Sequence, residues 1–179
     1  MNRLIVLCLL IGILGCSSEY NGRSADGWVD TWLRTESLET RRQALDVIIH
    51  RLGPRSFPAL VRRFGDQDFG ERAVALAIIV LNSERFAVSA ETDGFRVTPN
   101  PDPFSGRPWK RAASELKGAM RSHDPIVRKR AAFVSGCFGP SAGPLGLVPG
   151  LWALCNDDVQ EVKATAERAL VEAGALEQK

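Results

Sequence analysis

The sequence predicts an all-α fold in which helical hairpins stack into a short α-solenoid that carries one inserted β-hairpin. Its 179 residues are 45% hydrophobic and 25% charged, which is typical of one packed globular domain rather than a disordered chain. Helical periodicity recurs after residue 26, and in four apolar segments a basic residue is followed three positions later by alanine. The four pairs are Arg41 and Ala44, Arg72 and Ala75, Arg128 and Ala131, and Lys163 and Ala166.

The spacing of this pattern is typical of a repeat protein. The basic residues lie 31, 56 and 35 positions apart, and two of these intervals fall within the roughly 20–50 residues of solenoid repeats. The longer interval fits one repeat that is enlarged by an insertion. We expect the small alanine side chains to let neighbouring helices approach closely.

Residues that favour helix ends occur at matching places. We expect helices to start at an Asp-x-x-Glu capping box, at an Asp-Pro pair and at an aspartate followed three positions later by glutamine. The start residues are Asp68 with Glu71, Asp124 with Pro125, and Asp157 with Gln160, and the glycines expected to end helices are Gly53, Gly65 and Gly174. The second helix of each hairpin is then expected at 56–64, 108–121 and about 147–155.

The segment at about 84–107 interrupts the helical pattern. Two short alternating runs, 86–90 and 95–98, flank an Asp93-Gly94 pair, which is typical of a β-hairpin. Prolines at 99, 101, 103 and 108 exclude a helix in the part that follows. We therefore expect an inserted β-hairpin and loop. The insert either has a function or is a variable surface loop without one.

A second unusual segment is the uncharged stretch at 137–156, because a helix on the surface of a two-layer solenoid should show a polar stripe. It must be covered by the insert, by the first helix near Trp28 and Trp32, or by a partner. We expect an internal cover, and a partner surface is the alternative.

Three segments resemble HEAT repeats, particularly the short bacterial HEAT-like units. Residues 52–61 (LGPRSFPALV) are similar to the family's turn into its second helix, and 124–128 (DPIVR) and 157–163 (DDVQEVK) are similar to its entry into the first. The resemblance covers about 37–174, apart from 84–107. It implies an ARM-type superhelix that works by presenting a binding surface.

The amino terminus resembles a bacterial lipoprotein signal. An eleven-residue apolar run, 4–14, follows Arg3; as a helix it would span about 16 Å, too short for a bilayer core of about 30 Å. Ile13-Leu14-Gly15-Cys16 is similar to a lipobox, with Ile and Leu where Leu and Ala or Ser are usual. The resemblance implies a signal peptide at 1–15, a lipid on Cys16, a tether at 16–25 and a repeat domain at 26–179. An ordinary secretory signal is the alternative.

Residues for catalysis or metal binding are scarce. The sequence has no Walker, Gly-x-Gly-x-x-Gly or Gly-x-Ser-x-Gly motif, so we expect no cofactor other than the covalent lipid. We interpret His50 and His123 as structural. Cys137 and Cys155 are expected to lie roughly a helix length apart, too far for a disulfide.

Charge gives the strongest functional signal. The segment 107–130 holds eight basic and two acidic residues, and a helix starting at Pro108 would expose most of its cations. Stacking could align them with those of the preceding unit into one basic strip that contacts anionic lipid headgroups or an acidic protein; a plain solvated face is the alternative. The candidate partner-binding residues are Arg62, Arg63, Lys110, Arg111, Lys117 and Arg121.

These observations together predict a lipoprotein of the bacterial cell or outer membrane, exposed to the periplasm or the exterior. Its repeat surface would bind a partner protein, with no catalysis and no nucleic acid, since the net charge is only +2. Two alternatives remain. One is an envelope enzyme whose site the insert builds from groups such as Asp93, Asp102 and Arg107. The other is a structural component that self-associates through 137–156.

Overall fold

The computed structural model describes residues 19–91 and 94–177, and this part of the protein is mostly helical. Among these residues no helix is both long and apolar enough to span a bilayer. The helices are α2 (Ala25–Arg34), α3 (Leu38–Asp46), α4 (Phe57–Arg62), α5 (Gly70–Arg85), α6 (Arg107–Ala119), α7 (Pro125–Gly136), α8 (Val148–Leu154) and α9 (Gln160–Glu172). A π-helical turn at Val47–Leu52 continues α3, and 3-10 turns lie at Gly53–Ser56 and Gly139–Ala142.

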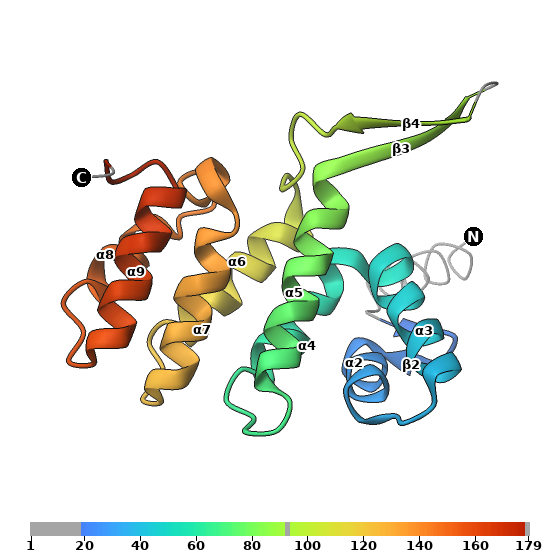
Figure 1. Ribbon diagram of the computed structural model, residues 1–179, viewed down its shortest axis with the longest axis horizontal. Helices are drawn as coiled ribbons and strands as arrows, with labels where there is room; N and C mark the ends of the chain where they lie inside the picture. Colours follow the sequence, from blue (N-terminus) through green and yellow to red (C-terminus); the bar gives the residue numbers. More distant parts are fainter. Residues whose placement is uncertain (1–18, 92–93, 178–179) are drawn as a thin grey trace, which may run out of the picture.

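The carboxyl-terminal two thirds of the chain form two layers of helices. Figure 1 shows α5, α7 and α9 side by side, with α4, α6 and α8 behind them. Helices α7 and α9 approach closely at Gly136, where an added Cβ would lie 2.8 Å from the Cα of Ala169. Glycine at this position therefore lets the two helix backbones meet.

The repeated alanines lie at equivalent places in three of the four helices. In α3, α7 and α9 the basic residue is the fourth of the helix, and Ala44, Ala131 and Ala166 are fully buried. In α5 the predicted close-packing alanine is wrong, because the pattern starts one position earlier in the helix. Arg72 is the third residue of α5, Ala75 is exposed, and Ala73 is buried instead.

The helix starts match the predictions in one place and differ in two. Asp124 caps α7 as expected, and its carboxylate accepts a hydrogen bond from the amide of Ile126 at 2.8 Å. Asp68 does not cap α5, because the carboxylate of Asp66 binds the amides of Asp68 and Phe69. Asp157, three residues before the start of α9, accepts a hydrogen bond from the amide of Val159 and forms no capping box with Gln160.

Two of the three predicted helix-ending glycines adopt the left-handed conformation. Gly53 (φ 50°) ends the π-helical turn and Gly174 (φ 67°) follows α9. Gly65 has no positive φ and lies beyond the end of α4, so it is not a helix cap of this kind.

An aromatic cluster lies at the centre of the core. Trp109 of α6 packs edge-on against Phe57 of α4, Phe104 of the insert and Phe138 after α7, with ring centroids 5.0–5.6 Å apart. All four side chains are at most 5% exposed. Edge-to-face pairs of this kind add stabilisation to the burial of their large apolar area.

The uncharged segment 137–156 is covered largely from within the chain. Phe104 of the insert covers Phe138, as one of the predicted covers requires. Leu147, Leu151 and Leu154 are buried, and α8 packs against α7 and α9, which were not among the predicted covers. On this segment the large exposed side chain is that of Trp152.

The predicted hairpin is present between α5 and α6. Strands β3 (Phe86–Glu91) and β4 (Gly94–Pro99) pair antiparallel, with Phe86 opposite Pro99 and Glu91 opposite Gly94. The hairpin extends away from the helices (Figure 1). Thr92 and Asp93, at its predicted turn, lie outside the described residues. Asn100 then returns the chain to the helices, since its amide donates to Arg85 O and its side chain to Glu84 O.

The folded domain begins earlier than residue 26. Strands β1 (Glu19–Tyr20) and β2 (Arg23–Ser24) form a small hairpin within the predicted tether 16–25. The Nε1 of Trp28 donates to Tyr20 O at 3.1 Å, which fixes this hairpin against α2. Cys16 and the predicted signal peptide 1–15 lie outside the described residues.

Replacing Trp109→Ala should lower the free energy of unfolding by about 3–5 kcal/mol, because it removes the side chain that the other three aromatic rings contact. Urea unfolding followed by circular dichroism measures the change. Trp152→Ala is the matched control and should cost less than about 1 kcal/mol, since that side chain is 45% exposed. Equal losses in the two variants would contradict the central role of the cluster.

Candidate functional site

Two of the predicted partner-binding residues are already paired within the chain. The guanidinium of Arg62 contacts the carboxylate of Asp26 at 2.6 Å, and that of Arg63 contacts Asp30 at 2.8 Å. Each pair is bidentate and joins α4 to α2. The hydrogen bonds that Arg63 donates to Asp30 are the main reason that the pKa of Arg63 is raised. These two arginines therefore hold α2 in place and do not extend a free basic strip.

Three of the other four candidates, Lys110, Arg111 and Lys117, belong to α6, and Arg121 lies two residues beyond its end. The predicted buried residues of this segment are all buried, and Ala119 is buried with them; they are Trp109, Ala112, Ala113 and Leu116 of α6 and Met120, which follows the helix. Lys110, Arg111 and Arg121 are exposed and Lys117 is half-buried, and none of these four forms an ion pair within the described part of the chain. Among the six candidates, the cations without an ion pair are thus those of α6 and of Arg121 in the turn that follows it. We call Lys110, Arg111, Lys117 and Arg121 the α6 basic face.

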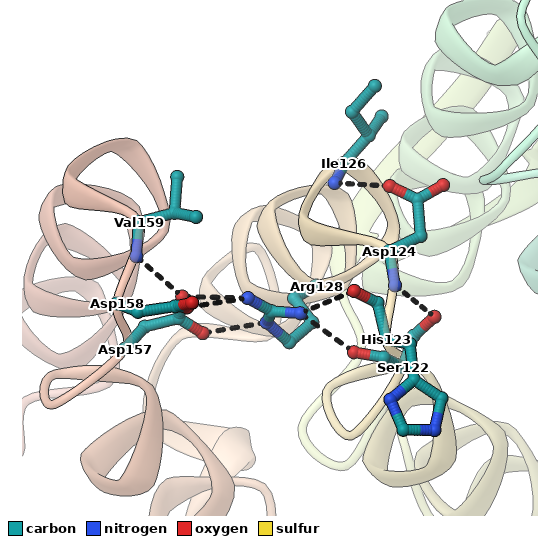
Figure 2. Close-up of polar contacts among 8 residues, drawn as sticks. All are labelled: Ser122, His123, Asp124, Ile126, Arg128, Asp157, Asp158 and Val159. Carbon is teal, nitrogen blue, oxygen red and sulfur yellow. Dashed lines mark hydrogen bonds and ion pairs between the residues drawn. The ribbon is translucent and has the colours of Figure 1, made fainter.

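A polar network joins the start of α7 to the start of α9. Figure 2 shows the guanidinium of Arg128 between the carboxylate of Asp157, at 2.7 and 2.8 Å, and the carbonyl oxygens of Ser122 and His123, at 2.9 and 3.0 Å. Asp158 adds a contact at 3.1 Å. Arg128 and Asp157 are 13% and 6% exposed, so the pair is largely shielded from water.

The two residues after Arg128 link α7 to neighbours on both sides. The amine of Lys129 contacts Glu161 of α9 at 2.6 Å. Arg130 contacts Glu71 of α5 at 2.8 Å and donates to Phe64 O in the loop before it. In the first hairpin, Arg41 donates to Thr35 O, which lies six residues before it, as Ser122 lies six residues before Arg128. Arginine side chains therefore bind loop carbonyls at this end of several helices.

The electrostatics of this network indicate a structural role. The Arg128 hydrogen bond is the main reason that the pKa of Asp157 lies well below its usual range, and Asp157 in turn raises the pKa of Arg128. Both groups stay charged at neutral pH and exchange no proton there. The sequence predicts Asp157 only as a helix cap, because spacing along the chain does not reveal which arginine faces it.

A pocket of about 620 Å³ lies at the opposite end of these helices, between α5, α7, α9 and the loop after β4. Its apolar wall includes Phe104 and Phe138 from the aromatic cluster, together with Ile78 and Phe133. The side chain of Phe133 is 42% exposed. The insert and the aromatic cluster therefore build part of a cavity that the sequence does not predict.

The polar lining of the pocket comes mainly from α5 and α9. Arg85, Arg168 and Glu172 are its charged residues. Arg85 donates to Cys137 O and lies over the ring of Phe104, 5.9 Å from the ring centroid. Burial raises the pKa of the Cys137 thiol, and the charge of Arg85 only partly opposes this. The thiol is therefore neutral near pH 7 and a poor nucleophile.

The residues considered for an enzyme do not meet in this pocket. Asp102 and Arg107 are exposed and absent from its lining, and Asp93 lies outside the described residues. Cys137 and Cys155 are both free thiols, as predicted. Within the described ranges no three His, Cys, Asp or Glu side chains are placed to hold a metal ion. His50 lies 3.9 Å from Asp46, and the backbone carbonyl of His123 binds Arg128.

Comparison with known proteins found no matching family model, no matching curated protein and no matching solved structure.

Acid should weaken the protein through Asp157. The pKa of Asp157 is lower in the folded state than in the unfolded state. The contribution of this carboxylate to the free energy of unfolding is therefore present above the unfolded-state pKa of about 3.9 and is lost as pH falls toward the folded-state pKa. Asp157→Asn should therefore lower the free energy of unfolding by about 1 kcal/mol at pH 7, and the difference from wild type should narrow below about pH 5.

Urea unfolding at a series of pH values measures this dependence. Asp158→Asn is the control, because Asp158 contacts the same guanidinium but is 89% exposed, and its effect should be smaller. A difference between Asp157→Asn and wild type that does not change with pH would exclude the ion pair as its source.

Proposed function

We propose that this protein is a lipid-anchored lipoprotein of the bacterial envelope whose HEAT-like repeat domain binds an acidic partner protein through the α6 basic face. The observation that carries the proposal is the contrast in pairing among the basic residues. Arg62, Arg63, Arg128, Lys129 and Arg130 all contact carboxylates within the chain, whereas the α6 basic face has no such contact among the described residues.

The free charges on α6 favour a binding surface over a structural one. Cations that stabilise this fold are bound to acids of a neighbouring helix, as Arg62 is to Asp26. Lys110 and Arg111 instead extend from a helix whose apolar face is already buried, and Arg121 is exposed in the turn after that helix, so the charge of all three is available to a partner. Complementary charge speeds association and selects against wrongly charged partners.

Several features support a HEAT-like solenoid as the finer architecture. Helices α5, α7 and α9 lie in one layer, and in α3, α7 and α9 a buried alanine follows the basic residue at the same helical positions. Contacts from Arg128 and Arg130 link each hairpin to the next at one end of this layer. Each unit thus contacts mainly its neighbours, as expected of stacked repeats.

The anchor rests on the resemblance of Ile13-Leu14-Gly15-Cys16 to a lipobox. Two residues, Ser17 and Ser18, separate Cys16 from Glu19, the first described residue, so the three residue steps between them span about 10 Å at most when extended. The proposed cellular location is the cell membrane or the outer membrane, with the domain on the periplasmic or outer side. Two or more acyl chains would be needed for firm attachment.

The two alternatives have less support. Self-association through 137–156 requires a free apolar surface, but Leu147, Leu151 and Leu154 are buried inside the domain. An enzyme site built by the insert requires Asp102 and Arg107 to converge, and both lie outside the lining of the pocket.

Lipidation is tested by the intact mass of the protein purified from membranes of a bacterium that modifies lipoproteins. The wild type should lack residues 1–15 and carry added acyl mass, and Cys16→Ala should carry none, because the acceptor thiol is gone. Cys155→Ala is the control and should keep the modification. A wild-type protein cleaved elsewhere without added lipid would remove the anchor from the proposal.

Partner binding is tested by crosslinking in intact cells of the bacterium that produces the protein, followed by purification. A Lys110→Glu, Arg111→Glu double variant should reduce the yield of a recurrent acidic partner at least tenfold, because two attractive charges become repulsive. Arg42→Glu, Arg55→Glu is the charge-matched control on other exposed segments and should leave the yield unchanged. Equal losses in both double variants would place binding elsewhere.

A further inference from the structure

We propose that the pocket between α5, α7, α9 and the insert loop binds a small amphipathic carboxylate, with an apolar body against the aromatic wall and its carboxylate near Arg168. The proposal uses neither the lipid anchor nor the α6 basic face, so it stands independently of the proposed function. Four properties of the pocket carry it: its size, its apolar wall, its charge and the rigidity of its insert side.

The size and wall of the pocket suit a small organic molecule. Its volume of about 620 Å³ lies within the roughly 300–1,000 Å³ of ligand sites in proteins. Phe104 and Phe138 belong to the buried core, whereas Phe133 keeps 42% of its surface exposed beside them. An apolar ligand would cover the exposed ring of Phe133, so that the surface of the ring and the surface of the ligand are both removed from water. This burial is the main source of affinity in such sites.

The charge of the lining favours an anion. Its charged residues are two arginines and one glutamate, which leaves one net positive charge. Arg85 is held in place by its hydrogen bond to Cys137 O, which uses one of the five N–H donors of a guanidinium. Arg168 is exposed and has no ion-pair partner in the described part of the chain, so its guanidinium is available for a planar carboxylate.

The insert side of the pocket is rigid although it belongs to a loop. Asn100 bonds to the last two carbonyls of α5, and Phe104 is inserted into the aromatic cluster. Figure 1 shows this loop on the same side of the molecule as the ends of α5, α7 and α9. A wall fixed in this way is preformed, which lowers the entropy lost on binding.

The first measurement is isothermal titration of the purified full chain with sodium decanoate, below its micelle concentration. The wild type should bind decanoate at least tenfold more tightly than the uncharged decanol and the cationic decyltrimethylammonium, because a charge-assisted contact to Arg168 is lost with either. N-acetyl-leucyl-phenylalanine is titrated in parallel. Tighter binding of decanoate indicates a fatty-acid ligand, and tighter binding of the dipeptide indicates a peptide carboxyl terminus.

Variants locate the binding site. Arg168→Gln should weaken decanoate binding about tenfold while leaving decanol unaffected, and Thr165→Trp should abolish binding by filling the pocket that Thr165 lines. Arg42→Gln on α3 is the control, because this exposed residue lies outside the pocket lining, and it should bind as the wild type does. Urea unfolding verifies that each variant is folded.

Three results would overturn the proposal. They are no binding of either carboxylate at millimolar concentration, equal affinity for decanoate and decanol, and wild-type affinity in a folded Thr165→Trp variant. Loss of the acidic protein partner in the charge-reversal test would affect none of these readouts, so the two proposals fail separately.

Discussion

The packing of Trp109 against three phenylalanines is the interaction on which both candidate binding surfaces depend. Trp109 orients α6, because the face that holds it also holds Ala112 and Leu116 and leaves the cations on the opposite side. Phe104 brings the loop of the insert into the core, and Phe138 fixes the turn after α7. The α6 basic face and the wall of the pocket are thus positioned by one group of buried rings from four separate segments.

Arginine has a second, distinct role at the other end of the helices. Loops there leave backbone carbonyls that the helices cannot satisfy, and the guanidinium of arginine can bind them and an acid at the same time. Arg128 does this with Ser122, His123 and Asp157, and Arg130 with Phe64 and Glu71. This use explains why so many of the basic residues contribute to the interior organisation of the protein rather than to its surface charge.

Local features of the structure can be predicted from the sequence because they depend on neighbours along the chain. The Asp124-Pro125 start of α7, the buried face of α6 and the β3–β4 pairing all follow from spacing within a few residues. Asp68 is wrong as a helix cap because Asp66, two residues earlier, orders the turn before α5 instead: its carboxylate accepts hydrogen bonds from the amides of Asp68 and Phe69.

Contacts between distant segments are harder to predict. Phe104 lies in a proline-rich loop without periodicity, so nothing near it in the chain indicates that it meets Phe138. Likewise, the pairing of Arg62 with Asp26 joins residues 36 positions apart, and a count of charges along the chain does not reveal it. The pocket could not be predicted for the same reason, because its walls come from four segments.

The hairpin at residues 19–24 has a consequence for geometry at the membrane. If Cys16 carries the proposed lipid, only a very short linker joins the lipid to the domain. The end of the domain that contains α2 and α3 is then held at the bilayer surface. Figure 1 places α9 at the far end of the longest axis from α2 and α3. The molecule then has a proximal and a distal end, and each surface along it sits at a set height above the lipid. A partner would be selected by its reach from the membrane as well as by its charge.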